Sequence, residues 1–168
     1  TGEIDWFRRY SHMRMHTAQH LMSGLAYELF DGVRTVGNQI NIDSSRIDFN
    51  PISFNETMLQ ELSESANHYV NDSFPVLDSV MTRQEINSIM PEERTNMDLL
   101  PKSVRDLRVI TIGNEFDLCP CAGTHVSNLS EIGDITIVSK KSKGKGTQRI
   151  KYQLSNNYTK REPNSTIV

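Results

Sequence analysis

Four side chains with the chemistry of metal ligands occur as two pairs of identical spacing. His16 and His20 are four residues apart, and so are Cys121 and His125. Two residues at positions i and i+4 of a helix lie on one face, so both histidines could reach a single ion. Cys121 and His125 would converge from a turn that contains the permissive Gly123. Nitrogen and sulfur donors of this kind bind zinc tetrahedrally, and we predict one zinc site formed by all four side chains.

The donor set alone leaves open whether such a site is structural or catalytic. Closed structural sites tend to contain several cysteines, whereas histidine-rich sites with a helical pair more often keep an exchangeable water. Four protein ligands would fill a tetrahedron, so in an enzyme one of them gives way or binds weakly. Thr17, Ala18 and Gln19 separate the helical histidines. The glutamate of an HExxH metalloprotease is missing there, which excludes protease chemistry.

Positive charge is concentrated in one segment of an otherwise acidic chain. The net charge is −3, but residues 140–151 contain six basic residues and no acidic one. Clustered charge attracts polyanions whatever the overall charge, so we expect a phosphate-contacting segment here. A solvated strand and loop is the alternative. The basic residues are Lys140, Lys141, Lys143, Lys145, Arg149 and Lys151.

The length of 168 residues suits one domain, which we place at residues 1–154, followed by a polar tail at 155–168. A disulfide between Cys119 and Cys121, with one residue between them, would be strained. Free thiols favour a reducing compartment. No apolar run approaches the ~20 residues of a membrane span. We therefore expect a cytoplasmic protein with no membrane contact.

Hydrophobic periodicity predicts the elements that must position these residues. Long helices are expected at residues 5–30, which contain both helical histidines, and at about 55–71. A hairpin is expected at 35–49, a strand at 76–81, a short helix at 82–90, a loop at 96–102 and a strand at 107–112. Strands at 132–139 and 148–154 would form a second hairpin, with the basic cluster in its loop at 140–146. This order predicts an α+β fold, with an antiparallel sheet packed on the two long helices.

Two short motifs, which contain the four candidate ligands, resemble those of a known family. The run His16-Thr17-Ala18-Gln19-His20-Leu21-Met22 resembles the HTAxHLL motif of the alanyl-tRNA synthetase editing domain and of its free-standing AlaX-type relatives. Cys121-Ala122-Gly123-Thr124-His125-Val126 resembles their CGGTHV motif. Thr124 favours the alanyl branch, because the threonyl-tRNA synthetase domain usually has proline there. Ala122 departs from the motif, and a non-glycine residue would be strained there if its φ were positive.

The resemblance implies an aminoacyl-tRNA hydrolase with the fold of the alanyl and threonyl editing domains. Its substrate would be tRNA(Ala) mischarged with serine, or with glycine, and its cofactor Zn²⁺ at His16, His20, Cys121 and His125. Two alternatives stay open at this stage: a zinc-stabilised RNA-binding module without catalysis, and an editing fragment of a larger alanyl-tRNA synthetase-like protein. A metal-dependent hydrolase of small esters or amides would have no use for the basic hairpin.

Discrimination of serine from alanine requires a group that hydrogen-bonds the serine hydroxyl. Thr17, Thr35, Asn38 and Gln39 are the candidates for substrate binding, and Thr35 is preferred because its position resembles the pocket-lining strand of the family. His16, His20 and Thr35 are therefore the expected catalytic residues. The basic residues between 140 and 151 are expected to bind tRNA, with Arg8, Arg9, Arg14 and Arg46 as weaker candidates.

Overall fold

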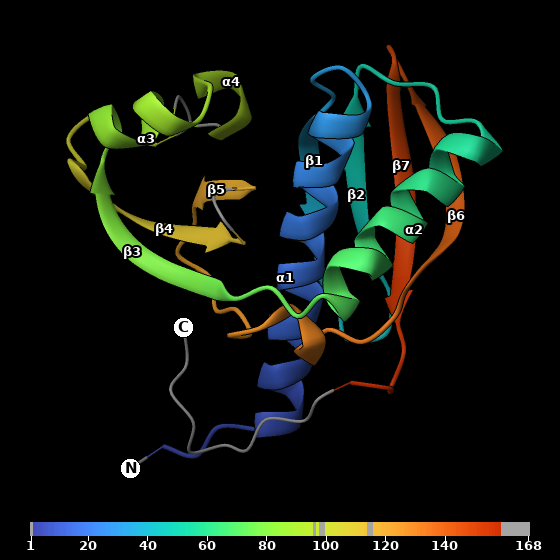
Figure 1. The fold of residues 1–168 in the computed structure, drawn as a ribbon, viewed down its shortest axis with the longest axis horizontal. Coiled ribbons are helices and arrows are strands. Elements are labelled where there is room, and N and C mark those ends of the chain that lie inside the picture. The colour runs from blue at the N-terminus through green and yellow to red at the C-terminus, as the bar shows by residue number, and fades with distance from the viewer. Residues whose placement is uncertain (1, 96, 98–99, 114–115, 159–168) are drawn as a thin grey trace.

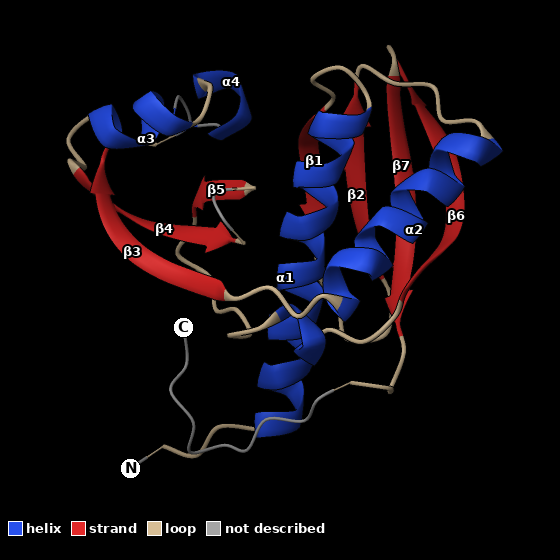
Figure 2. Ribbon diagram, in the orientation of Figure 1, coloured by secondary structure: helices blue, strands red, loops and turns tan. Residues whose placement is uncertain are grey.

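The structure, a computed structural model, describes residues 2–95, 97, 100–113 and 116–158 (Figure 1). Helices and antiparallel strands form an α+β fold in these residues, as predicted (Figure 2). The helices are α1 (Trp6–Leu29), α2 (Glu56–Asn71), α3 (Arg83–Ile89), α4 (Glu92–Thr95) and the 3-10 helix η2 (Leu129–Glu131). The strands are β1 (Arg34–Gln39), β2 (Ser45–Asn50), β3 (Val76–Thr82), β4 (Asp106–Ile112), β5 (Asp117–Pro120), β6 (Ile135–Gly144) and β7 (Thr147–Leu154).

A four-stranded antiparallel sheet in the order β1-β2-β7-β6 forms one layer of the main body. Side chains alternate along its central strands, so that Ile47, Phe49, Ile150 and Tyr152 are fully buried on one face. Helices α1 and α2 lie across this face (Figure 1), and their apolar side chains complete the main core. Asp5 caps the N-terminus of α1 by accepting a hydrogen bond from the Arg8 amide.

A second, three-stranded sheet in the order β3-β4-β5 corrects the expectation of one sheet. Strand β4 explains the separation, because it is buried on both faces. Leu107 and Val109 pack in a small core with α3, whereas Ile110 and Ile112 alternate with them and pack in the main core. Strand β4 packs against both cores, so it lies between them and does not extend the four-stranded sheet.

The basic hairpin also differs from its predicted boundaries. Strand β6 begins only at Ile135, because residues 129–131 form a 3-10 helix with Asn128 as its N-cap. It then continues to Gly144, which pairs with Thr147. The connecting loop is therefore reduced to Lys145 and Gly146, both with positive φ, as in a tight two-residue hairpin turn. Most of the basic residues consequently lie on regular strands.

Two predicted irregular segments are only partly described. Within the expected loop at 96–102, residues 96, 98 and 99 lie outside the described residues, as do residues 159–168 of the predicted tail. The start of that tail packs on α1, where the Arg14 guanidinium lies 3.5 Å from the centre of the Tyr158 ring. Helix α4 and strand β5 were not predicted.

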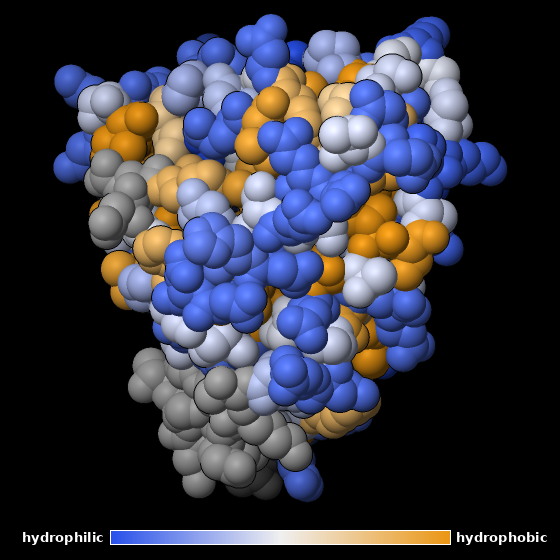
Figure 3. Space-filling model, turned by 45° about the vertical axis from the view of Figure 1, so that its right-hand side comes forward, coloured by the Kyte–Doolittle hydropathy of each residue, from blue (hydrophilic) through white to orange (hydrophobic). Residues whose placement is uncertain are grey.

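The surface of α2 follows the amphipathic pattern of its sequence. Leu62, Ala66 and Val70 are buried, and the opposite side of the helix contributes to the largely hydrophilic face seen in Figure 3.

Among the described residues, no helix combines the length and the apolar character needed to cross a membrane.

Candidate metal centre and cleft

Helix α1 contributes one wall of the candidate site. His16, Gln19, His20 and Ser23 recur at intervals of three and four residues, so that they lie on one face of the helix. This face lies along a cleft, and the opposite side, with residues such as Ala18 and Leu25, is buried in the main core. The regular backbone of a long helix therefore fixes the relative positions of these four side chains.

The turn from Cys121 to His125 contributes the other wall. Arg108 on β4 holds it by donating from Nη1 to the carbonyls of Cys121, at 2.9 Å, and Gly123, at 2.8 Å. A Cβ added to Gly123 would lie 2.7 Å from His16 Nδ1, so only glycine fits this close approach. Ala122 is exposed and is not among the described residues with positive φ, so the departure from the family motif brings no backbone strain.

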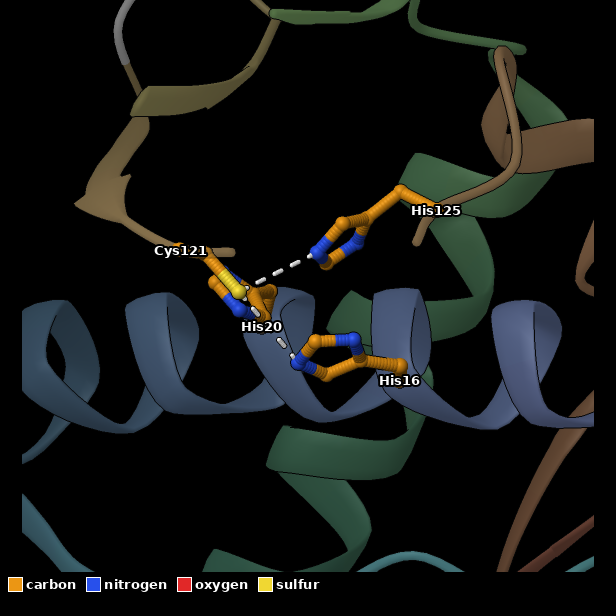
Figure 4. A group of neighbouring side chains, drawn as sticks. All are labelled: His16, His20, Cys121 and His125. Atoms are coloured by element: carbon orange, nitrogen blue, oxygen red, sulfur yellow. Dashed lines mark hydrogen bonds between the residues drawn. The ribbon is translucent and has the colours of Figure 1, made fainter. Parts of the chain in front are cut away.

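The two walls bring the four predicted ligands together (Figure 4). One donor atom from each of His16, His20, Cys121 and His125 lies within 4.8 Å of the others. Cys121 Sγ is 3.6 Å from His16 Nε2 and 3.5 Å from His125 Nε2. Four converging nitrogen and sulfur donors could hold one metal ion. His12 and His68 take no part in this cluster.

The three histidine rings are oriented by hydrogen bonds from their other nitrogen. His16 Nδ1 donates to the Thr124 carbonyl at 3.3 Å, and His20 Nδ1 to Asp117 Oδ2 at 3.2 Å. His125 Nδ1 donates to the Thr17 hydroxyl at 3.1 Å. When Nδ1 alone carries the proton, each Nε2 has its lone pair free for a metal ion, the arrangement of most histidine ligands.

The two cysteines differ in the pKa of their thiols. Burial raises the pKa of the Cys121 thiol, but the adjacent side chains of His125, His16 and His20 outweigh burial and lower that pKa to about 3. Burial, with Asp117 and Cys121 nearby, raises the pKa of Cys119 above its ordinary value. Cys121 is therefore the thiolate, the form that binds metals, and Cys119 remains a thiol.

An open cleft of about 620 Å³ adjoins the cluster. Its lining includes His16, His20 and Cys121 beside residues of β1, α4 and β5, whereas His125 lies fully buried behind them. Three of the four candidate ligands therefore face a space that a small molecule or the end of a chain could enter. The volume is within the range of ordinary ligand pockets.

Thr35 and Asn38 line this cleft, and Thr17 and Gln39 do not. Thr17 is fully buried, and its hydroxyl donates to Met13 O and accepts from His125 Nδ1 and the Val126 amide. One donor and two acceptors are all that a hydroxyl offers, so Thr17 has no capacity left for a substrate.

Gln39 is directed away from the cleft by the pleat of β1. Thr35 pairs with Phe49 and Asn38 with Ile47, both on the core-facing side of β2, and a register shift between Thr35 and Gly37 keeps them on that side. Gln39 pairs instead with Arg46, on the outer face, and accepts a hydrogen bond from Arg46 Nε at 2.9 Å.

The predicted tRNA-binding residues fall into two groups. Several are engaged within the protein: Arg149 binds both carboxylate oxygens of Asp48, at 2.6 and 2.8 Å, and Lys140 binds Glu56 at 2.8 Å. Arg46 also binds Asp48, and the buried Arg14 donates to backbone carbonyls. Of the predicted residues, the exposed lysines with no ion-pair partner among the described residues are Lys141, Lys143, Lys145 and Lys151. Arg8 is exposed and Arg9 half-buried near the start of α1.

Four of the cleft residues that were not predicted form hydrogen bonds or ion pairs around the donor cluster and the cleft: Gln19, Ser23, Asp117 and Arg94. Gln19 and Ser23 share the helix face of His16 and His20, so helical spacing was a signal that could have revealed them. Asp117, which orients His20, also lies 3.6 Å from Arg94 Nη2. Arg94 in turn donates to the Phe116 carbonyl and to Glu28. No local pattern marks Asp117 or Arg94, because they meet α1 only in the folded chain.

Comparison with known proteins finds sequence similarity to proteins of tRNA editing and aminoacylation. Residues 107–151 match the family model described as the threonyl and alanyl tRNA synthetase second additional domain. Alanyl-tRNA editing proteins AlaX-M from Methanosarcina barkeri and Saccharolobus solfataricus are 33% and 34% identical to this chain over 91% of its length. An alanine–tRNA ligase from Methanothrix thermoacetophila is 30% identical over 90% of this chain and 16% of its own length.

The matched region is only part of these relatives. The chain spans 62% and 63% of the length of the two editing proteins. The match to the family model, residues 107–151, includes Cys121, His125 and most of the basic hairpin. Most of this chain is therefore similar to part of the alanyl-tRNA editing proteins and to a segment of an alanine–tRNA ligase.

Proposed function

We propose that this chain deacylates tRNA(Ala) mischarged with serine, and with glycine, by hydrolysis of the aminoacyl ester at a zinc site. The observation that carries the proposal is the open side of the donor cluster: His16, His20 and Cys121 line the cleft. A purely structural site would be sealed from substrate, as expected for the alternative of a zinc-stabilised RNA-binding module. The names of the related editing proteins support the assignment to tRNA editing.

The donor set fits zinc better than harder metals. Zinc prefers thiolate and imidazole ligands, whereas magnesium and calcium prefer oxygen. A tetrahedron with Zn–S and Zn–N bonds of usual length has sulfur–nitrogen edges of ~3.6 Å, and Cys121 Sγ lies 3.6 and 3.5 Å from two imidazole nitrogens. Bound zinc supplies positive charge that polarises the ester carbonyl or acidifies a water.

The residues around the donors would position the ester. Thr35 and Asn38 line the cleft from β1, where a hydroxyl or amide could hydrogen-bond the serine hydroxyl. A site built to bond a hydroxyl rejects a substrate that lacks it, because its own polar group is then left unpaired. This gives a physical reason why seryl-tRNA would be preferred over alanyl-tRNA. Glycyl-tRNA also lacks a hydroxyl, so its hydrolysis would not depend on this contact. Thr17 and Gln39 are no longer candidates, since the Thr17 hydroxyl is engaged within the protein and Gln39 lies on the outer face of the sheet.

The basic hairpin lies where a tRNA end could extend from the cleft. Arg34, which lines the cleft, pairs with Asn50, and the Asn50 side chain donates to the Lys145 carbonyl at 2.9 Å. The turn of the hairpin and the start of β1 are thus neighbours at one end of the sheet (Figure 1). We assign backbone binding to Lys141, Lys143, Lys145 and Lys151, the exposed lysines of this hairpin.

One assay tests the proposal. Seryl-, glycyl- and alanyl-tRNA(Ala) are incubated side by side with the protein, with and without a zinc chelator, and with zinc added back. We expect hydrolysis of the seryl and glycyl esters that is lost with chelator and restored by zinc, and little hydrolysis of the alanyl ester. Binding of tRNA without hydrolysis of any ester would instead favour the RNA-binding module.

A second arm tests the selecting residue. Thr35→Val keeps the shape of the side chain and removes its hydroxyl, so it should reduce hydrolysis of seryl-tRNA more than that of glycyl-tRNA. Equal rates on seryl-tRNA for the variant and the parent protein would remove Thr35 from this role.

A further inference from the structure

A chain of three polar side chains crosses from α1 to β1 in the lining of the cleft. Gln19 Nε2 donates to Ser23 Oγ at 2.8 Å, and Ser23 Oγ lies 2.6 Å from Thr35 Oγ1. Gln19 and Ser23 are one helical turn apart on the face that presents His16 and His20. All three residues line the cleft.

The order of donors along this chain determines what Thr35 offers. A hydroxyl has one proton to donate and can accept two hydrogen bonds. Either hydroxyl could donate in the Ser23–Thr35 bond, and we take the direction in which Ser23 accepts from the Gln19 amide and donates its own proton to Thr35 Oγ1. Thr35 then keeps its proton for a partner in the cleft. A hydrogen-bonded chain of this kind polarises its members, so the last hydroxyl becomes a better donor.

We propose that Gln19 and Ser23 fix the Thr35 hydroxyl as a directed hydrogen-bond donor for the side-chain hydroxyl of a seryl ester. Ser23 is then a positioning residue for substrate selection that acts through Thr35. The inference rests on the proposed function and deepens it. It explains how a rotatable threonine hydroxyl could discriminate reliably: fixed by Ser23, it no longer samples orientations in which it bonds elsewhere.

A purely structural role for Ser23 would have a different consequence. The Ser23–Thr35 bond also joins α1 to β1, and loss of this link alone would affect all substrates alike. Loss of a directed donor affects only a substrate that carries a hydroxyl. Glycyl-tRNA, which has none, is therefore the internal reference, and the ratio of seryl to glycyl hydrolysis is the quantity that separates the two roles.

The experiment compares Ser23→Ala, Ser23→Thr and Thr35→Val, with Ser11→Ala on the same helix as the matched control. We expect Ser23→Ala to lower kcat/KM for seryl-tRNA(Ala) about tenfold, with unchanged hydrolysis of glycyl-tRNA and unchanged zinc content. Ser23→Thr retains a hydroxyl and should preserve most of the seryl activity. Ser11→Ala should leave both activities unchanged.

The double variant Ser23→Ala/Thr35→Val tests whether Ser23 acts through Thr35. It should be no worse on seryl-tRNA than Thr35→Val alone, because this relay of hydrogen bonds from Gln19 through Ser23 to Thr35 has lost the Thr35 hydroxyl in both variants. Additive losses, or equal losses on seryl and glycyl esters, would overturn the relay while leaving the hydrolase assignment intact. Parent protein that hydrolyses none of the esters would overturn the proposed function, and the relay with it.

Discussion

The two walls of the metal centre are built on different physical principles. On α1, the repeat of the helix alone places His16 and His20 on one face. In the turn, Cys121 and His125 depend on contacts from elsewhere: Arg108 holds two carbonyls, and Thr17 accepts from His125. The helical wall is therefore fixed locally and the turn by long-range contacts. Small changes should be tolerated on the helix and costly in the turn.

Removal of a ligand should have the largest effect, whichever wall it comes from. His20→Ala or Cys121→Ala deletes one donor, and we expect zinc affinity to fall by more than about 100-fold, the upper range for loss of an outer partner. Metal content and competition with a chelator measure this. His12→Ala is the matched control, because His12 lies two turns before His20 on α1 and outside the cluster. Equal losses from His12→Ala would contradict the assignment.

Gly123→Ala tests the turn at the position where it lies closest to the His16 ring of α1. The added methyl would overlap the His16 ring and push the turn away from the helix. We expect a fall in zinc affinity of about 10- to 100-fold, as for lost ligand orientation. Ala122→Gly, one residue earlier at an exposed position, should leave the affinity unchanged. If both variants bind zinc like the parent protein, the turn is less constrained than its contacts indicate.

Asp117→Asn should have a smaller effect, because it changes the charge and keeps the shape of the group that orients His20. The amide can still accept the hydrogen bond, so we expect a loss of zinc affinity of about tenfold, at the lower end for such partners. Calorimetric titration with zinc gives the measurement. An unchanged affinity would limit Asp117 to its contact with Arg94, which a fall in Tm would report.

The same contrast explains what could be read from the sequence. Periodicity placed α1, and the motif spacing identified all four candidate ligands, which the structure brings together. Thr17 is next to His16 in sequence, but neighbouring residues on a helix point about 100° apart. Positions three and four residues apart would have led to Gln19 and Ser23, which do line the cleft.

Residues fixed by long-range contacts left no such pattern. Asp117 begins the four-residue β5, and Arg94 belongs to the short α4, segments too brief for periodicity to reveal. The split into two sheets was hidden for a related reason. Leu107 to Ile112 reads as an apolar strand, and only the fold shows that its two faces serve different cores.

Substitutions in the basic hairpin should have the smallest effects, since the hairpin belongs to neither wall of the metal centre. Lys143→Gln/Lys145→Asn removes two exposed charges, and asparagine suits the positive φ of Lys145. Each phosphate contact contributes about 1 to the slope of log K against log salt, so the slope for tRNA binding should fall by up to about 2. Lys102→Gln, outside the hairpin, is the control.

Arg149→Gln sharpens this last test, because Arg149 is bound to Asp48. Its loss should lower Tm and leave the salt slope close to that of the parent protein, whereas the lysine pair should change the slope and leave Tm unaltered. The reverse outcome would mean that Arg149 leaves Asp48 to bind RNA. Zinc content should stay constant in all of these variants, since the hairpin contributes no donor to the cluster of described residues.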